Sequence, residues 1–313
     1  MRRQRLLVIL SPAELEAQPE PALERATFLA RETGAGLEIF VSEPRSAAHG
    51  PGGAAASQAE VGDTLERLRA IGTTLTEAHG LSVATDAVFC RHPFDGIMQK
   101  VASTRPDMVV KTTRHDTRLN RTFFNYTDWH LIRACPCPLL LVKSADPWET
   151  RRIVACVDPA HVHSHAETLD EVIVETAHLL AYRLRGELHI FHSVELMLEP
   201  VFSLLQPDSS YQLYKRRMGE AHYGLLDDLL RRYGIGAERV HLSVGRPTET
   251  LVEFTRDIRA SLVVMGAVSK GALELLLIGN TAEKVLDDLS CDILVVKSEP
   301  LEARVAAELC RAC

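Results

Sequence analysis

The sequence of 313 residues lacks any apolar run that approaches the roughly 18 residues of a membrane-spanning helix. Its basic N-terminus precedes an apolar run, Leu6–Leu10, that is shorter than the roughly 7–15 residues at the centre of a signal peptide. We therefore expect a soluble cytoplasmic protein without a membrane span.

The sequence also lacks an excess of positive charge. Its 42 acidic residues outnumber the 35 basic ones, and the formal net charge is -7. Nucleic acids and anionic membranes attract proteins through clustered Lys and Arg, so we expect neither as the main partner. Seven cysteines, an odd number, fit a reducing compartment better than a disulfide framework.

Motifs that mark common catalytic sites are absent from the sequence. Neither the phosphate-binding pattern Gly-x₄-Gly-Lys-Ser/Thr nor the hydrolase pattern Gly-x-Ser-x-Gly occurs. No pair of carboxylates is spaced so that two elements would clearly bring it together. We therefore predict a protein that is not an enzyme, since a fold alone does not imply a reaction.

What the sequence does contain is a regular alternation of strand-like and helix-like segments. With 46% hydrophobic residues it can build more than one core. We predict strands over 5–10, 37–41, 81–89, 108–111, 139–142, 152–157, 188–192, 240–244, 261–265 and 293–296. We predict helices over 21–33, 65–79, 93–104, 127–133, 167–185, 212–233 and 247–259, and a loop over 44–57. This alternation is typical of α/β folds with a doubly wound parallel sheet.

The second half of this pattern repeats the first. A shift of 154 residues places Lys143 on Lys297 and Pro93 on Pro247 without a gap between them. Such repetition at one offset indicates a duplicated domain. We divide the chain into a first domain over 1–146, a second domain over 147–300 and a C-terminal tail over 301–313.

The stretch that begins at Gly266 carries most of the functional signal. Gly266 ends a predicted strand, and Asn280 with Glu283 has the spacing of a helix capping box. A helix N-terminus that follows a strand-end loop is a natural anion site. The first copy has Thr112 in place of Gly266 and has no glycine from there to Tyr126. We therefore expect a site in the second domain and a degenerate site in the first.

Basic residues mark the same stretch of the first copy. Lys111, Arg114 and Arg118 lie in or beside it. A charge run of this kind is typical of an exposed loop, and a surface for a partner is the alternative.

Asp158 ends the first strand of the second copy. In a doubly wound sheet, ligands bind outside the carboxyl ends of the strands where the strand order reverses. If the first and fourth strands are neighbours, this position lies between Asp158 and Gly266. The carboxylate of Asp158 either contacts a ligand there or caps the turn at Pro159, and the sequence leaves both interpretations open.

Four runs of sequence are similar to one known family. They are Val263-Val-Met-Gly266, Ile278-Gly-Asn-Thr-Ala-Glu283, Cys291-Asp-Ile-Leu-Val-Val-Lys297 and Thr127–Pro138. These runs resemble the universal stress protein family, in particular its tandem two-domain, E-type branch. The resemblance covers nearly the whole chain and implies two flavodoxin-like domains.

The family's nucleotide signature is Gly-x₂-Gly-x₉-Gly followed by Ser or Thr. By this resemblance its positions fall on Gly266, Ser269, Gly279 and Asn280, with Met265 and Thr281 beside them. Asp158 stands where the family has an acid that contacts the base, so the resemblance implies ATP as the ligand. Ser269 and Asn280 depart from the signature, which predicts weak binding.

Two further segments allow alternative interpretations. His161, His163 and His165 follow Asp158 closely and either bind a transition metal or belong to a turn. The apolar segment Val194–Leu205 either packs against the protein itself or forms a site for an apolar ligand.

From these observations we predict a non-catalytic stress-response protein whose second domain binds ATP weakly. The alternatives are a carrier or sensor of an apolar small molecule and a slow ATP hydrolase. The expected partners are a small-molecule ligand and, within the chain, the other domain, while the sequence leaves open whether the protein forms a homo-oligomer.

Overall fold

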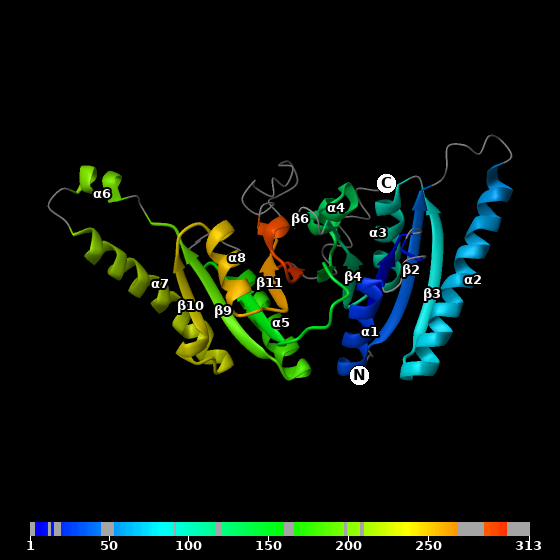
Figure 1. Ribbon diagram of the computed structural model, residues 1–313, viewed down its shortest axis with the longest axis horizontal. Coiled ribbons are helices and arrows are strands. Elements are labelled where there is room, and N and C mark those ends of the chain that lie inside the picture. The colour runs from blue at the N-terminus through cyan, green and yellow to red at the C-terminus, as the bar shows by residue number, and fades with distance from the viewer. Residues whose placement is uncertain are drawn as a thin grey trace. The chain divides into compact units, whose positions relative to one another are not determined.

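Figure 1 shows the computed structural model of the protein, which describes residues 4–11, 14–15, 20–44, 53–90, 92–116, 121–159, 166–196, 199–206, 210–267 and 285–298. Contacts between Cα atoms divide these residues into two compact units. The first unit contains the described residues up to 148 together with 292–298. The second unit contains those from 149 to 291.

The first unit is built on a sheet with the strand order β12-β7-β4-β1-β2-β3. Its strands are β1 (Arg5–Leu10), β2 (Gly36–Pro44), β3 (Val83–Cys90), β4 (Met108–Thr112), β7 (Leu139–Val142) and β12 (Asp292–Val296). Neighbouring strands run parallel from β7 to β3, whereas β12 runs antiparallel to β7. A small antiparallel hairpin pairs β5 (Arg114–Asp116) with β6 (Arg121–Phe123).

Four helices connect the strands of this sheet. They are α1 (Pro21–Thr33), α2 (Gly53–His79), α3 (Pro93–Thr104) and α4 (Tyr126–Ala134). A proline at the first position starts α1 and α3, and a left-handed Gly34 at φ 73° ends α1. A capping box between Asn125 and Asp128 starts α4. Figure 1 shows α2 lying along β3.

The second unit has a parallel sheet with the order β10-β9-β8-β11. Its strands are β8 (Arg152–Cys156), β9 (Glu187–Val194), β10 (Val240–Val244) and β11 (Leu262–Gly266). Its helices are α5 (Ala166–Leu184), α6 (Glu199–Leu205), α7 (Tyr211–Tyr233), the 3₁₀ turn η1 (Ala237–Arg239) and α8 (Pro247–Asp257). Residues 285–288 form a further short helical turn.

The central strands of both units have continuous buried stretches. Leu6–Leu10 and Leu139–Val142 are buried in the first unit, and Ile153–Ala155 and Leu262–Val264 are buried in the second. Parallel strands that are covered on both faces read as continuous apolar runs, which is why these segments do not alternate. Among the helices that the structure describes, none combines the length and hydrophobicity needed to cross a bilayer.

Asp292 fixes the antiparallel strand β12 in the first unit. Its Oδ2 atom lies 2.7 Å from Nε of Arg25 and accepts a hydrogen bond from Nε1 of Trp148 at 2.9 Å. Its Oδ1 atom accepts the backbone N–H of Lys143 at 3.0 Å. Asp292 and Arg25 are both buried, so this ion pair is enclosed in the core of the unit.

The predicted fold class, two tandem α/β units of the doubly wound type, is confirmed. In each unit the first strand lies beside the fourth, as β1 beside β4 and β8 beside β11. The proposed boundary at residue 300 stays a prediction. Strand 292–296, which we assigned to the second domain, pairs with β7 among the residues of the first unit.

Three local predictions differ from the structure. The loop expected over 44–57 is interrupted by α2, which begins at Gly53, because an alanine-rich segment has high helix propensity even without apolar periodicity. The hairpin of β5 and β6 lies in a stretch that was expected to be a basic loop. The segment between β9 and α7, expected as a loop, contains α6.

Candidate functional site

The strand order of the second unit reverses between β8 and β11. Val263 pairs with Val154 and Val264 with Ala155, so the two strands end at the same edge of the sheet. Asp158 follows the end of β8, and Gly266 is the last residue of β11. The two residues that sequence reasoning placed at this crevice therefore lie at the carboxyl ends of adjacent strands, where doubly wound folds bind ligands.

The backbone N–H of Asp158 is hydrogen-bonded within the unit, and its side chain is partly exposed to solvent. Its backbone N–H donates to Oδ1 of Asp170 at 3.1 Å, and Asp170 is buried at the start of α5. The Asp158 side chain is 51% exposed and its Oδ1 lies 3.9 Å from Nδ1 of His192. This carboxylate is accessible to a hydrogen-bond donor from outside the protein, such as an exocyclic amine.

Two histidines behind Asp158 form a hydrogen-bonded pair that the sequence did not reveal. The carbonyl oxygen of Val157 can only accept, so Nδ1 of His192 donates to it over 2.9 Å. Nε2 of His192 lies 2.7 Å from Nδ1 of His222 on α7, and the rings stack with centroids 4.9 Å apart. This contact requires one proton between the two rings. The pair ties α7 to the strand end beside Asp158.

Gly266 has a packing role of its own. A Cβ atom at this position would lie 2.6 Å from Cδ2 of Leu169, far closer than side-chain carbons approach each other. Gly266 therefore lets α5 pack closely against the end of β11, which is one of the reasons proteins use glycine. Met265, which precedes it, is partly exposed.

The remaining predicted site residues lie outside the residues that the structure describes. They are Ser269, Gly279, Asn280, Thr281 and the histidines His161, His163 and His165. Their part in the site stays a prediction. Across the described ranges, no group of three or more His, Cys, Asp or Glu side chains is arranged to hold a metal ion.

The same strand-end position in the first unit is filled by the protein itself. The Thr112 hydroxyl donates to the Glu20 carboxylate and accepts the backbone N–H of Ala22 at 2.9 Å. The carboxylate also accepts the N–H groups of Ala22 and Leu23 at the start of α1, at 3.2 and 2.5 Å. Burial raises the pKa of Glu20. The Glu20 carboxylate thus caps the N-terminus of α1 from within the chain.

Lys111 does not belong to an exposed basic loop, as we had expected. Its Nζ atom lies 2.7 Å from Oδ1 of Asp128, a fully buried carboxylate that also caps α4 by accepting the N–H of Asn125. The lysine is drawn inward because a buried carboxylate needs a cation. The side chains of Arg114 and Arg118 lie outside the described residues.

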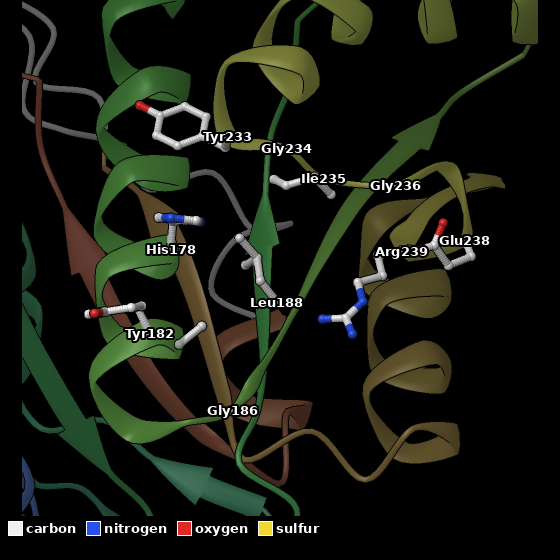
Figure 2. A pocket seen from close by; sticks show the side chains of 11 residues that line it. His178, Tyr182, Gly186, Leu188, Tyr233, Gly234, Ile235, Gly236, Glu238 and Arg239 are labelled. Atoms are coloured by element: carbon white, nitrogen blue, oxygen red, sulfur yellow. The ribbon is translucent and has the colours of Figure 1, made fainter.

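A cavity of about 380 Å³ lies at the opposite edge of the second sheet. It is bounded by the start of β9 at Leu188 and by the turn between α7 and β10. Figure 2 shows His178, Tyr182 and Tyr233 on one side of it and Arg239 on the other. Sequence reasoning missed this cavity, although the paired glycines around Ile235 mark the turn that bounds it.

Comparison with known proteins agrees with this architecture. The chain matches the universal stress protein family over residues 5–143 and again over 149–297. It is 27% identical to universal stress protein E of Escherichia coli K12 over 311 residues, which covers 96% of each chain. A Haemophilus influenzae homolog of universal stress protein E is 31% identical over 205 residues, covering 65% of this chain and 66% of that protein.

A solved structure shares the fold over nearly the full length. It is a protein of Pseudomonas aeruginosa PAO1 described as functionally unknown, with 25% sequence identity and a TM-score of 0.73, and the match covers 99% of this chain and 98% of that one. The fold thus defines a protein of two tandem α/β units of the doubly wound type. The chain belongs to the universal stress protein family, as a tandem two-domain, E-type member.

Proposed function

We propose that the second unit binds a nucleotide such as ATP at the carboxyl ends of β8 and β11, and that the protein serves the stress response through this binding rather than through catalysis. The observation that carries the proposal is the accessible carboxylate of Asp158 at the strand-order reversal beside Gly266. The filled site of the first unit supports it by contrast, because Glu20 already takes the anion position there.

Asp158 is the residue that would contact the base. Its backbone N–H is bound by Asp170, so the main chain at this position does not have to be ordered when a ligand binds. The exocyclic amine of adenine is a donor of the kind that a carboxylate accepts. The spacing of Gly266, Ser269 and Gly279 supports a phosphate position, and this part of the proposal rests on the sequence.

The binding is proposed to be weak. Ser269 stands where the signature has glycine, and a side chain in a left-handed conformation costs about 1 kcal/mol. That cost alone reduces affinity about fivefold. The two alternatives, an apolar-ligand carrier and a slow ATP hydrolase, stay predictions, and neither is favoured by the geometry around Asp158.

Titration calorimetry of the full chain with ATP tests the proposal. We expect measurable heat at millimolar ATP and at least about a fivefold loss of affinity in Asp158→Asn, which keeps the shape but removes the charge. The matched control is Asp257→Asn, since Asp257 is an exposed acid of the same unit, on α8. Glu20→Gln is expected to leave the affinity unchanged, because it alters the first unit alone.

Two results would overturn the proposal. One is the absence of heat at millimolar ATP, and the other is equal affinity in Asp158→Asn and Asp257→Asn. A parallel assay of phosphate release separates binding from hydrolysis, since steady release at a rate that scales with protein would favour the hydrolase.

A further inference from the structure

Two cysteine thiols lie side by side in the core of the first unit. Cys135 directly follows α4, and Cys137 lies two residues before β7. Their Sγ atoms are 3.7 Å apart, and the two residues are 1% and 5% exposed. Neither cysteine takes part in a disulfide. Two free thiols at this separation are a pair of soft ligands for a metal ion.

Packing alone does not account for both thiols. The offset of 154 residues places Cys137 on Cys291 of the second copy, but it places Cys135 on Leu289. Leu289 is buried, with an exposed fraction of 1%, so an aliphatic side chain fills the same place in the other unit. The fold therefore accepts leucine where the first unit has its second thiol.

The backbone around the pair is fixed on both sides. The N–H of Cys135 donates to the carbonyl oxygen of Leu131 at 2.8 Å, which ties it to the last turn of α4. The carbonyl oxygen of Pro138 accepts the N–H of Val109 at 2.9 Å, just before β7 begins. Prolines at 136 and 138 restrict the backbone further. The two sulfurs therefore do not have to be brought together when a metal binds.

The distance between the two sulfurs suits a single metal ion. Metal–thiolate bonds are about 2.3 Å long, so two of them in line span about 4.6 Å. The 3.7 Å between the Sγ atoms lies within this reach. One ion therefore fits between the thiolates after small side-chain rotations, without movement of the backbone.

The number and type of ligands select the metal. Structural Zn²⁺ sites use four ligands, and across the described ranges no group of three or more His, Cys, Asp or Glu side chains is arranged for a metal ion. Thiolates favour Cu(I), an ion that forms stable complexes with two sulfurs alone. The burial of both cysteines favours the same ion, because a site closed to water supplies no further ligands.

A cation beside the pair offsets the single negative charge of such a complex. Nζ of Lys297 donates to the carbonyl oxygens of Arg133 and Cys135, the latter at 2.9 Å. The hydrogen bond with Cys135 and burial raise the pKa of the Cys137 thiol, whereas the charge of Lys297 acts in the opposite sense. A buried anion needs a nearby cation, and Lys297 supplies one at the end of β12.

We propose that Cys135 and Cys137 bind one Cu(I) ion as a buried bis-thiolate, with Lys297 balancing the charge of the complex. Binding replaces the two thiol protons: Cu⁺ and two thiols give Cu(SR)₂⁻ and two released protons, and no atom changes its oxidation state. The site lies in the first unit and does not depend on the nucleotide proposed for the second.

Competition for Cu(I) between the reduced chain and the chelator bicinchoninate, without oxygen, tests the proposal. The reference protein is the full chain with Cys310→Ser/Cys313→Ser, because these two cysteines of the C-terminal tail also offer a pair of thiols. We expect one tightly bound Cu(I) per reference chain. Adding Cys135→Ser/Cys137→Ser is expected to lower the affinity at least about a hundredfold.

Two further variants of the reference protein keep this test independent of folding. Cys135→Leu copies the residue of the second unit, so it is expected to fold and to lose Cu(I) as the double variant does. The matched control is Cys90→Ser/Cys156→Ser, which removes two cysteines elsewhere and is expected to leave the affinity unchanged. Circular dichroism shows whether each variant stays folded.

The charge and proton balance give separate measurements. The apparent affinity for Cu(I) is expected to rise about a hundredfold per pH unit near neutrality, because two protons leave for each ion bound. Lys297→Met is expected to weaken binding about tenfold, whereas Lys297→Arg keeps the cation and most of the affinity. X-ray absorption at the copper edge is expected to show two sulfur ligands.

The proposal fails if the reference protein and its Cys135→Leu variant bind Cu(I) equally, or if the Cys90/Cys156 control loses as much affinity. It also fails if the pair oxidises readily to a disulfide but takes up no Cu(I), since this result would assign the thiols to redox chemistry.

Discussion

In the first unit Thr112 ends the fourth strand and its hydroxyl meets α1 at Ala22, whereas in the second unit Gly266 ends the fourth strand and lies against Leu169 of α5. The larger side chain belongs to the strand in one unit and to the helix in the other. The same closeness of helix and strand is thus reached in two ways. A glycine at this position is therefore not by itself evidence of a ligand.

The acidic residues near these strand ends, Glu20 and Asp158, differ more clearly between the two units. Glu20 is buried, and its carboxylate accepts hydrogen bonds from the start of α1 and from the Thr112 hydroxyl. Its hydrogen-bonding groups are therefore satisfied within the first unit. The Asp158 side chain is 51% exposed, and its Oδ1 lies 3.9 Å from Nδ1 of His192. Two duplicated units thus place an acid near the same strand end in different environments, one buried and capping a helix and the other half exposed.

The largest expected effect on stability concerns the buried ion pair between Arg25 and Asp292 in the first unit. Asp292→Ala leaves the Arg25 guanidinium buried without its carboxylate, and we expect the first unit to lose about 3–5 kcal/mol of unfolding free energy. Urea unfolding followed by tryptophan fluorescence measures this, because both tryptophans, Trp129 and Trp148, lie in the first unit. The second unit is expected to unfold as before.

Two controls sharpen this experiment. Asp288→Ala removes an exposed acid four residues earlier and is expected to change stability by less than about 0.5 kcal/mol. Burial raises the pKa of Asp292 and lowers that of Arg25, so desolvation opposes the pair. The double variant Arg25→Met/Asp292→Leu is accordingly expected to lose less than Asp292→Ala. Equal effects of Asp292→Ala and Asp288→Ala would contradict the assignment.

The next largest effect tests whether the small residue Gly266 on β11 is needed to make room for Leu169 on α5. Gly266→Ala places a Cβ against Leu169, and we expect a loss of about 1–3 kcal/mol in the second unit. Leu169→Ala alone leaves a cavity and is expected to cost about 2–5 kcal/mol. Combined, the two changes place alanine on both sides of the contact, so the added Cβ occupies part of the space that Leu169 leaves, and their joint cost is expected to be smaller than the sum.

Hydrogen exchange of the amides in β11 and α5 measures these differences in the second unit. Gly224→Ala on α7 is the control, because nothing lies within 4 Å of its added Cβ and alanine favours helix, so a small gain in stability is expected. Additive costs for Gly266→Ala and Leu169→Ala would show that the two residues do not share one packing contact.

The sequence carried the arrangement of strands and helices but not their long-range partners. The repeat at an offset of 154 residues indicated the two units, whereas the adjacency of β8 and β11 was only a condition of the doubly wound pattern, which the structure meets. The apolar run predicts a strand over 293–296, yet it contains no information on the pairing with β7 or on the contact of Asp292 with Arg25, which lies far away in the chain. The helix α6 was missed because seven residues with apolar groups on both sides show no amphipathic period.

The candidate site was predictable to the same limited degree. Asp158 and Gly266 follow from the rule for strand-order reversal. His192 lies on a strand and His222 on a helix further along the chain, so no local sequence pattern predicts that they pair. The sequence does contain a signal for the role of Glu20, since an acid directly before Pro21 has the position of a helix cap.

The smallest expected effect is a difference between the two units in how their stability changes at low pH. His189 on β9 lies 3.1 Å from His241 on β10, and burial lowers the pKa of both, although Glu187 beside His189 raises it in part. Arg239 and Arg152 oppose the charged form of His189 as well, and the ring of Phe254 lies 4.3 Å from that of His241.

A histidine whose pKa is lower in the folded state stabilises the protein above its ordinary pKa, and this contribution is lost as the pH falls through about 6.5 toward the folded value. Glu20 has a raised pKa, so its contribution changes in the opposite sense and grows as the pH falls. Lowering the pH from about 7 to about 5 is therefore expected to lower the stability of the second unit relative to that of the first.

His241→Gln should reduce this difference in stability, while His178→Gln, at an exposed position, should not. Because fluorescence follows the first unit and hydrogen exchange resolves the second, parallel loss of stability in both units would show that these histidines do not set the acid response.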